Sequence, residues 1–269
     1  MLVIGENINA TNRSVAEAIA RRDREFLGNL AITVAAAGAD FVDVNAGTGQ
    51  GSPEKETATM EWLVEIVQEA TDRPLAIDSE IPSVIEAALH KCYGDKLLIN
   101  SVTAEREKLA AVGPLAAERK AWLVALTMGT NCIPNNVEER LVACELIMTH
   151  LARLGLEAEQ IFFDPLVIPI SVDSRQGMVT LRTIEQIKSR YPGARTVMGL
   201  SNISYGLPNR RLVNRGFLLM AAYAGLDAVI LDPLDAKIMS FIRVANMLTG
   251  EDHLCKKYIR DHRKGVLVD

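Results

Sequence analysis

The sequence predicts an α/β fold, a closed (β/α)8 barrel of the TIM barrel type. Eight short apolar runs alternate with stretches of helical character, the pattern of parallel strands joined by helical crossovers. The runs are nearly continuously apolar, as expected for strands that are covered on both faces. The length of 269 residues suits one barrel, which takes about 250 residues, and no linker divides the chain. We therefore expect a single domain over residues 1–269.

Each expected element has its own local signal. Helix 14–37 has apolar residues at helical spacing and stops before Gly38, helix 56–70 gathers its large apolar residues on one face, and helix 82–90 opens with a proline. The expected strands cover residues 2–7, 40–45, 74–79, 96–101, 122–127, 161–165, 195–202 and 227–233. The other expected helices cover residues 104–112, 138–154, 178–190, 214–224 and 236–248. The charged residues 251–269 are expected to cap the bottom of the barrel or to fray.

Composition argues against several classes of function. The net charge is −5 and no basic stripe carries interleaved aromatics, so we expect no nucleic-acid partner. The amino-terminal residues lack a cleavable signal and no apolar run approaches about 18 residues, so we expect no membrane association and a cytoplasmic location. The four cysteines contain no CxxC pair, and the four histidines fall in expected helices or in the tail. Neither pattern predicts a metal site.

Polar side chains occur at the carboxyl ends of most expected strands, where the chemistry of such barrels takes place. These residues are Asn7, Asn45, Asp78, Asn100, Asp164, Asn202 and Asp232. A carboxylate accepts two neighbouring N–H bonds, and a carboxamide offers both donors and an acceptor. Several of each around one pocket, without His or Lys, suit a neutral planar heterocycle such as a pterin.

Single positions have simpler explanations. An Asp or Asn after a strand is also a common helix cap or turn residue. Asp232, which precedes Pro233, has the pattern of a turn, and Asp43 is expected one position inside its strand, bonded to neighbouring strand ends. For Glu6 a salt bridge or a turn contact is favoured over an acid in the barrel floor. The set as a whole still indicates a binding pocket.

Several long motifs resemble methyltetrahydrofolate:corrinoid methyltransferases, the family that includes the methyltransferase of the corrinoid iron–sulfur protein. They include MLVIGENIN, FVDVNAG, INSVTAEREK, MGLSNIS and NRRLVNRGFLLMA, and the resemblance covers about residues 1–235. It implies a homodimeric, pterin-binding barrel that uses tetrahydrofolate or 5-methyltetrahydrofolate as a substrate. The corrinoid would come from a partner protein, since the chain has no DxHxxG corrinoid motif.

The resemblance also implies roles for particular residues. Asn202 would lie near the N5 nitrogen that carries the methyl group and act in catalysis. The implied substrate-binding residues are Asp78, Asn100 and Asp164 at the pterin edge, Asn45, Gly199 and Ser201 around the pocket, and Arg210 toward the folate tail. The chain departs from better-known members after ALTM and after SNIS, in segments expected at the pocket mouth.

The expected function is transfer of a methyl group between N5 of tetrahydrofolate and the cobalt of a corrinoid protein, in either direction. One alternative is a dihydropteroate synthase-like enzyme. That chemistry calls for a Lys after the seventh strand and an Arg–His pair near the eighth, where this chain has Ser201-Asn202 and Leu231-Asp232-Pro233. The other alternative is a folate-binding protein without turnover.

Overall fold

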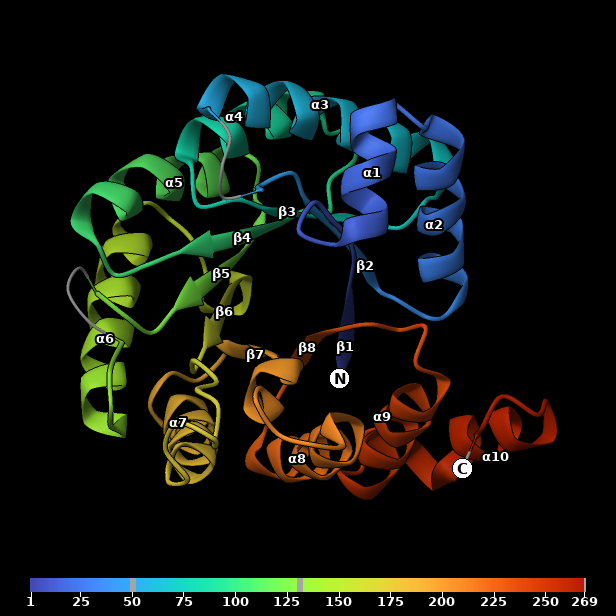
Figure 1. Cartoon of the computed structure of the whole chain (residues 1–269). Helices are drawn as coiled ribbons and strands as arrows, with labels where there is room; N and C mark the ends of the chain where they lie inside the picture. Colours follow the sequence, from blue (N-terminus) through green and yellow to red (C-terminus); the bar gives the residue numbers. More distant parts are fainter. Residues whose placement is uncertain (49–51, 130–132, 269) are drawn as a thin grey trace.

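The computed structural model describes residues 1–48, 52–129 and 133–268 and confirms the predicted barrel. Eight parallel strands follow one another in chain order, and β8 pairs with β1 to close the sheet (Figure 1). The strands are β1 Leu2–Asn9, β2 Phe41–Asn45, β3 Leu75–Asp78, β4 Leu98–Val102, β5 Trp122–Leu126, β6 Ile161–Asp164, β7 Arg195–Gly199 and β8 Ala228–Leu231. All eight overlap the expected runs.

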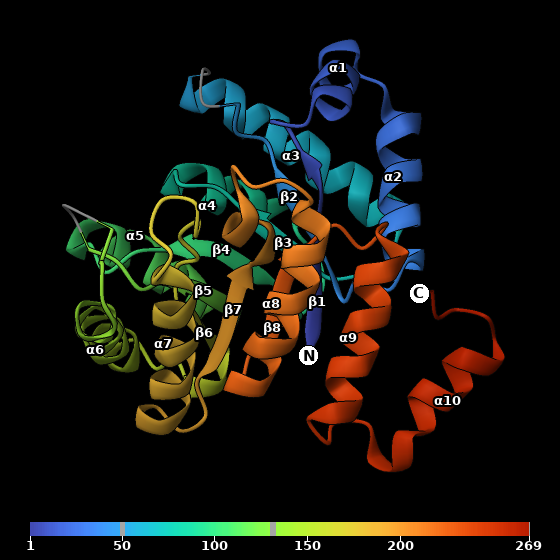
Figure 2. The same cartoon turned by 60° about the horizontal axis from the view of Figure 1, so that its bottom comes forward.

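Helices surround the strands and cover the outer face of the sheet (Figures 1 and 2). They are α1 Arg13–Arg21, α2 Arg24–Ala36, α3 Pro53–Ala70, α4 Pro82–Lys91, α5 Arg106–Glu118, α6 Val137–Arg153, α7 Gln176–Arg190, α8 Arg210–Ala224, α9 Ala236–Leu248 and α10 Lys256–Arg263. Short 3-10 segments lie at Ala158–Gln160, Leu200–Ser204 and His253–Cys255. None of the helices in the described ranges is both long and apolar enough to cross a bilayer.

The single helix expected over residues 14–37 is wrong, because the chain breaks it into α1 and α2. Arg22 takes a left-handed conformation with φ of 54°, which ends α1. Asp23 then caps α2 by accepting a hydrogen bond from the backbone N–H of Phe26 at 2.9 Å. The Asp in the sequence RRDRE was the local signal for this second start.

Two other helix boundaries differ from the expectation by four residues or more. Helix α5 continues through Pro114 to Glu118, because Leu109, Val112 and Ala116 remain packed against the barrel. Helix α8 begins at Arg210 rather than at residue 214, so the arginines after Pro208 belong to its first turn. In α5, tertiary packing thus overrides the local breaking signal of Pro114.

Over residues 251–268 the carboxyl-terminal segment lies on the outside of the barrel and does not cap its bottom. Helix α10 lies beside α9 on the outside of the molecule (Figure 2). Arg243 of α9 holds it there through an ion pair between Nε and Asp261 Oδ2 at 2.8 Å. The backbone N–H of Val268 also donates to Ser240 Oγ at 2.8 Å.

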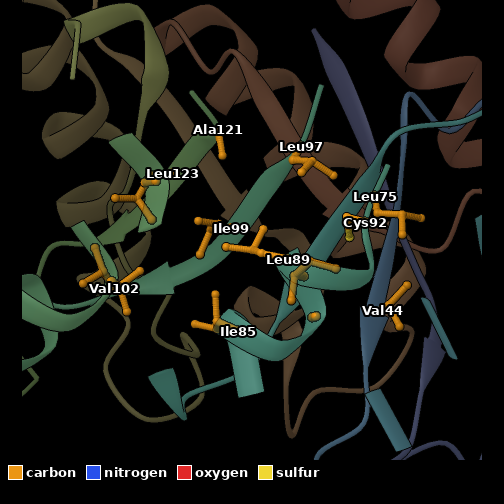
Figure 3. Packing of buried hydrophobic residues seen from close by; sticks show 14 of the residues in the cluster. Val44, Leu75, Ile85, Leu89, Cys92, Leu97, Ile99, Val102, Ala121 and Leu123 are labelled. Atoms are coloured by element: carbon orange, nitrogen blue, oxygen red, sulfur yellow. The ribbon is translucent and has the colours of Figure 1, made fainter. Parts of the chain in front are cut away.

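The barrel is packed shut at its amino-terminal end. Trp122 lies between Phe41 and Phe162, with ring centroids 5.5 and 5.1 Å apart. Lys96 and Arg195 approach the Trp122 ring at 5.0 and 4.5 Å, which adds cation–π attraction. On the outer face of the sheet, buried side chains of the strands pack against those of α4 and form the core shown in Figure 3. Since this end is filled, a ligand can reach the inside only from the carboxyl ends of the strands.

Candidate functional site

Three of the predicted residues lie level with one another at the mouth of the barrel. The strand register pairs Asn45 of β2 with Asp78 of β3, and Asp78 with Asn100 of β4. Asn45 donates from Nδ2 to Asp78 Oδ2 at 2.8 Å, and its Oδ1 accepts from the backbone N–H of Gly47 at 2.8 Å. Asn45 therefore orients the Asp78 carboxylate. Its amide group donates to Asp78 and its Oδ1 accepts from Gly47, so both ends of the side chain are occupied.

Asp43 lies two residues before Asn45 in β2, deeper in the barrel, and is hydrogen-bonded to two residues of this row. Asn100 donates from Nδ2 to Asp43 Oδ1 at 3.3 Å, and Asp43 also shares a hydrogen bond with Asp78. Burial, together with the nearby Asp78 charge, raises the pKa of Asp43 well above its usual range. Asp43 therefore loses its proton less readily than an ordinary aspartic acid does. The expectation that Asp43 bonds to neighbouring strand ends is confirmed.

Asp78 is the anionic member of the row. Burial raises its pKa to about 6, while the hydrogen bond from Asn45 opposes the rise. At neutral pH the carboxylate is thus ionised, and it can accept N–H bonds from a ligand that lies over the barrel. Asn100 Oδ1 accepts no hydrogen bond from the residues that the structure describes, so it is a second acceptor for such a ligand.

Asp164 supplies another carboxylate, two strands away from Asn100. Its Oδ1 accepts from the backbone N–H of Leu166 at 2.8 Å, and Leu166 turns the chain sharply with a φ of 60°. Burial raises the pKa of Asp164 to about 6, which the Leu166 hydrogen bond and the nearby Arg140 charge partly offset. Oδ2 has no hydrogen-bond donor in the described part of the chain and remains available to a ligand.

Asn202 lies beyond the end of β7, on the 3-10 segment that begins at Leu200. Its side chain is exposed and makes no hydrogen bond to the residues of known position in the structure. A Cβ atom at Gly199 would lie 3.3 Å from Asn202 Nδ2, so the glycine leaves room for this amide. The amide is therefore free to bond an incoming group.

Arg210 holds the Asn202 segment in place. Its Nη2 donates to the backbone oxygen of Ser201 at 2.7 Å, and its Nε donates to Ser204 Oγ at 3.1 Å. The guanidinium also lies 5.8 Å from the centre of the Tyr205 ring. The structure thus brings Arg210 and Ser201 together, and the two hydrogen bonds fix the segment that carries Asn202. Arg210 is also exposed, so it can contact a ligand.

The strand ends at β1 and β8 bond to each other. Asn7 donates from Nδ2 to Asp232 Oδ1 at 2.7 Å, and the same oxygen accepts from the backbone N–H of Leu234 at 2.9 Å. The turn role expected for Asp232 is confirmed. Glu6 lies within strand β1 and forms no ion pair with the residues that the structure describes, so the favoured salt bridge or turn contact is wrong. Burial, with the neighbouring Asp232 and Asp78 charges, raises its pKa.

A cavity of about 400 Å³ opens between this rim and the start of α8. Glu6, Ser201, Arg210 and Asp232 are among its lining residues. It has both carboxylates and arginines on its walls, so it extends the polar mouth of the barrel from β7 to β1.

The sequence did not point to Arg140, a buried arginine whose charge lowers the pKa of Asp164. It lies on α6 with no exposed surface, on the same helix face as Cys144 and Ile147. Its helical spacing from those two apolar residues was the available signal, because it places the charge on the buried face.

Replacing Asp164 with Asn should stabilise the ligand-free protein at pH 8 and hardly affect it at pH 4. The folded protein keeps this proton up to about pH 6, whereas an unfolded chain releases it near the usual value of 3.8. The free energy of unfolding therefore falls as the pH rises from about 4 to about 6 and stays low above that. Removing the charge should recover about 3 kcal/mol at pH 8. Chemical denaturation at the two pH values measures the gain, and Asp95→Asn, at an exposed position, serves as the control. Equal gains at both pH values would contradict the assignment.

Comparisons with known proteins agree with the barrel and with its polar mouth. The model of the family "Pterin binding enzyme" matches residues 5–232. The chain is 36% identical to methylcorrinoid:tetrahydrofolate methyltransferase of Eubacterium limosum, over 99% of this chain and 98% of that protein. It is 28% identical to methionine synthase of Mycobacterium tuberculosis over 91% of this chain, which corresponds to 21% of that longer protein.

A solved structure adds information on the fold alone. Dihydropteroate synthase of Vibrio fischeri superposes with a TM-score of 0.71 over 92% of both chains, at 16% identity. Together with the match over residues 5–232 and the full-length relative, these findings show that the chain belongs to the pterin-binding enzyme family, alongside the methylcorrinoid:tetrahydrofolate methyltransferase.

Proposed function

We propose that this protein transfers a methyl group between the N5 nitrogen of tetrahydrofolate and a corrinoid carried by a separate protein. The observation that carries the proposal is the polar row at the barrel mouth, together with the Asn202 amide, which has no hydrogen-bond partner among the described residues. Asp78 and Asn100 stand level on adjacent strands, and Asn202 projects from the end of β7. The full-length relative that is 36% identical has this activity in its name.

In this proposal the pterin is held by its amide-like edge. The Asp78 and Asp164 carboxylates accept its amino and ring N–H groups, and Asn100 bonds the opposite groups. An analogue without those groups would leave buried polar atoms unpaired, so recognition is selective. Asn45, Gly199 and Ser201 shape the pocket, and Arg210 reaches toward the folate tail.

Asn202 has the catalytic role. A tertiary amine is a poor leaving group, so N5 must gain a proton or a strong hydrogen bond as its bond to the methyl carbon breaks. The Asn202 amide can hydrogen-bond N5 and stabilise the charge that develops there, while the proton comes from water. When bound at the mouth, the partner's corrinoid cobalt supplies the acceptor or the donor of the methyl group.

The geometry gives no support to pyrophosphate chemistry of the dihydropteroate synthase type. Ser201 and Asn202 follow β7, and Asp232 follows β8, so neither place has the cation that a pyrophosphate leaving group requires. The similarity to such synthases concerns the fold, at 16% identity.

A spectrophotometric assay tests the proposal. The protein is mixed with reduced cob(I)alamin and methyltetrahydrofolate, and separately with methylcob(III)alamin and tetrahydrofolate. We expect protein-dependent interconversion of the cobalt spectra, with the ratio of rates reporting the favoured direction. Tetrahydrofolate binding without transfer, even with a corrinoid protein present, would indicate a binding protein, and loss of both would refute the pterin site.

We also propose that the protein acts as a single domain, as a homodimer and in the cytoplasm. Exposed apolar side chains on α7 and α8 support the dimer: Met178, Met220 and Tyr223 are 49%, 50% and 86% exposed around a shallow hollow. The cysteines that the structure describes are free thiols, as is usual in a reducing compartment.

Replacing Tyr223 with Asp should convert the dimer to a monomer. A carboxylate placed in an apolar contact loses its hydration without gaining a partner. Light scattering coupled to size exclusion should show a mass of twice 29.4 kDa for the native protein and of 29.4 kDa for the variant. Tyr93→Asp, at an exposed tyrosine before β4, should remain dimeric. A dimeric Y223D protein would place the contact elsewhere.

A further inference from the structure

Exposed apolar side chains gather on one half of the barrel mouth. Within the described parts of the loops that follow the strands, every exposed large apolar residue comes after β5, β6, β7 or β8. These residues are Ile133, Val172, Tyr205 and Leu234. The other half of the mouth, after β2, β3 and β4, holds the polar row that includes Asp78. Apolar groups that remain exposed together often mark a binding surface, so this half of the mouth suits an apolar ligand.

Tyr205 is the member of this group that stands closest to Asn202 along the chain. Its backbone N–H donates to the backbone oxygen of Asn202 at 3.1 Å. The guanidinium of Arg210 lies 5.8 Å from the centre of the Tyr205 ring, yet the residue is 66% exposed. The tyrosine hydroxyl makes no hydrogen bond to any residue of described position. The ring is therefore held beside the segment that carries the Asn202 amide, with most of its surface open to a ligand.

The loop after β6 fixes Tyr205 from the other side. Ser171 Oγ donates to the backbone oxygen of Tyr205 at 2.6 Å, and the backbone N–H of Ile170 donates to the backbone oxygen of Ile203 at 3.2 Å. Val172, the residue after Ser171, is 75% exposed. The two hydrogen bonds join the loops after β6 and β7, so Val172 and Tyr205 belong to one preformed surface. A surface that is ordered before binding loses less conformational entropy when a ligand binds.

The methyl transfer proposed above places a second substrate over Asn202. The methyl group must lie between N5 and cobalt, because the bond that forms and the bond that breaks are in line. Cobalt is at the centre of the corrin ring, a flat macrocycle much wider than the methyl group, so the ring must extend over side chains next to Asn202. Its face is conjugated and its edge carries methyl groups and amides. Exposed aromatic and aliphatic side chains therefore suit it better than the polar row does.

We propose that Tyr205 and Val172 bind the corrin ring of the methyl donor or acceptor. The aromatic ring of Tyr205 covers part of the macrocycle, and Val172 contacts the methyl groups at its edge. The inference rests on the proposed function, since it takes a corrinoid as the second substrate. It adds that this chain recognises the corrinoid itself, on the loops after β6 and β7, in addition to any contacts with the protein that carries it.

Steady-state transfer from methylcob(III)alamin to saturating tetrahydrofolate tests the proposal. In Tyr205→Ala the KM for methylcobalamin should rise about tenfold or more, because the ring no longer covers the macrocycle. In Val172→Asp it should rise by a similar factor, because a carboxylate against the apolar edge loses hydration without gaining a partner. The tetrahydrofolate affinity, measured by anaerobic calorimetry, should stay within about twofold of the native value, since sites without shared contacts change independently.

Two further variants separate the loss of the ring from a general loss of structure. Tyr205→Phe keeps the ring, and its KM for methylcobalamin should stay within about threefold of the native value. Tyr93→Ala removes a tyrosine of matched exposure, 65%, which lies before β4 at the other end of the barrel. This control should change neither the KM for methylcobalamin nor the tetrahydrofolate affinity.

Equilibrium dialysis of methylcob(III)alamin against the folate-free protein measures the same contact without turnover. The dissociation constant should rise about tenfold in Y205A and V172D, and Y93A should match the native protein. Native values in Y205A and V172D, or the absence of saturable binding by the native protein, would overturn the proposal. A loss of tetrahydrofolate affinity in Y205A as large as the loss for methylcobalamin would also overturn it, and would assign the surface to the folate tail.

The two readouts distinguish failure of the inference from failure of the proposed function. A native protein that binds methylcobalamin through Tyr205 but transfers no methyl group, even with a corrinoid protein present, refutes the function and leaves the corrin site in place. Native transfer with an unchanged KM and an unchanged dissociation constant in Y205A refutes the corrin site alone.

Discussion

Replacing Asn202 with Ala should slow methyl transfer by about 100-fold to 1000-fold, the usual effect of removing one hydrogen-bond donor from a site of developing charge. The tetrahydrofolate affinity should change by no more than about threefold, because the bond to N5 strengthens only in the transition state. The structure supports this separation. Asn202 lies on the 3-10 segment Leu200–Ser204 after β7, whereas Asp78 and Asn100, which would hold the pterin, belong to β3 and β4.

Stopped-flow measurement of the cobalt spectra gives the rate, and calorimetry gives the affinity. Asn29→Ala is a matched control, since Asn29 is an exposed asparagine on α2 and its loss should change neither quantity. Equal losses of rate and affinity in N202A would make Asn202 a binding residue. An unchanged rate would remove it from the mechanism.

Replacing Asp78 with Asn should weaken tetrahydrofolate binding by about 100-fold or more, since a hydrogen bond to a charged group contributes about 1.5–3 kcal/mol and two are affected. The new amide would also turn a donor toward the donors of the pterin edge and toward Asn45, which donates to Asp78 at 2.8 Å. Methyl transfer at low tetrahydrofolate concentration should fall in proportion.

The pH dependence of tetrahydrofolate binding by the native protein provides a second test of the role of Asp78. Asp78 binds the ligand as a carboxylate and its pKa is raised to about 6, so affinity should fall as the pH drops through that value. In D78N this contribution to the pH profile should disappear. Asp72→Asn, at the other end of β3, is the control that should leave affinity and profile unchanged. If D78N bound tetrahydrofolate with the native affinity, Asp78 would not be a pterin-binding residue.

The alternation of apolar runs and helices was enough to predict the barrel and the order of its strands. That information is local, because a strand buried on both faces must be apolar and a parallel neighbour requires a crossover. The polar residues at the strand ends could be predicted for the same reason. Once the strands are parallel, Asn45, Asp78 and Asn100 must come to the same end of the sheet.

Some boundaries could not be read from local sequence. The break at Arg22 depends on a left-handed residue, and the path of α5 through Pro114 depends on packing against the barrel. In both cases the sequence around the boundary is compatible with more than one backbone, and distant contacts choose between them.

The sequence by itself determined the fold class, the edge of the sheet that carries the site and the types of group gathered there. The tertiary structure decided how those groups share protons and charge. Burial raises the pKa of Asp43 well above its usual range and that of Asp78 to about 6, and the Arg140 charge opposes the rise in the pKa of Asp164. These properties depend on distances across strands and on exclusion of water, which exist only once the barrel has closed.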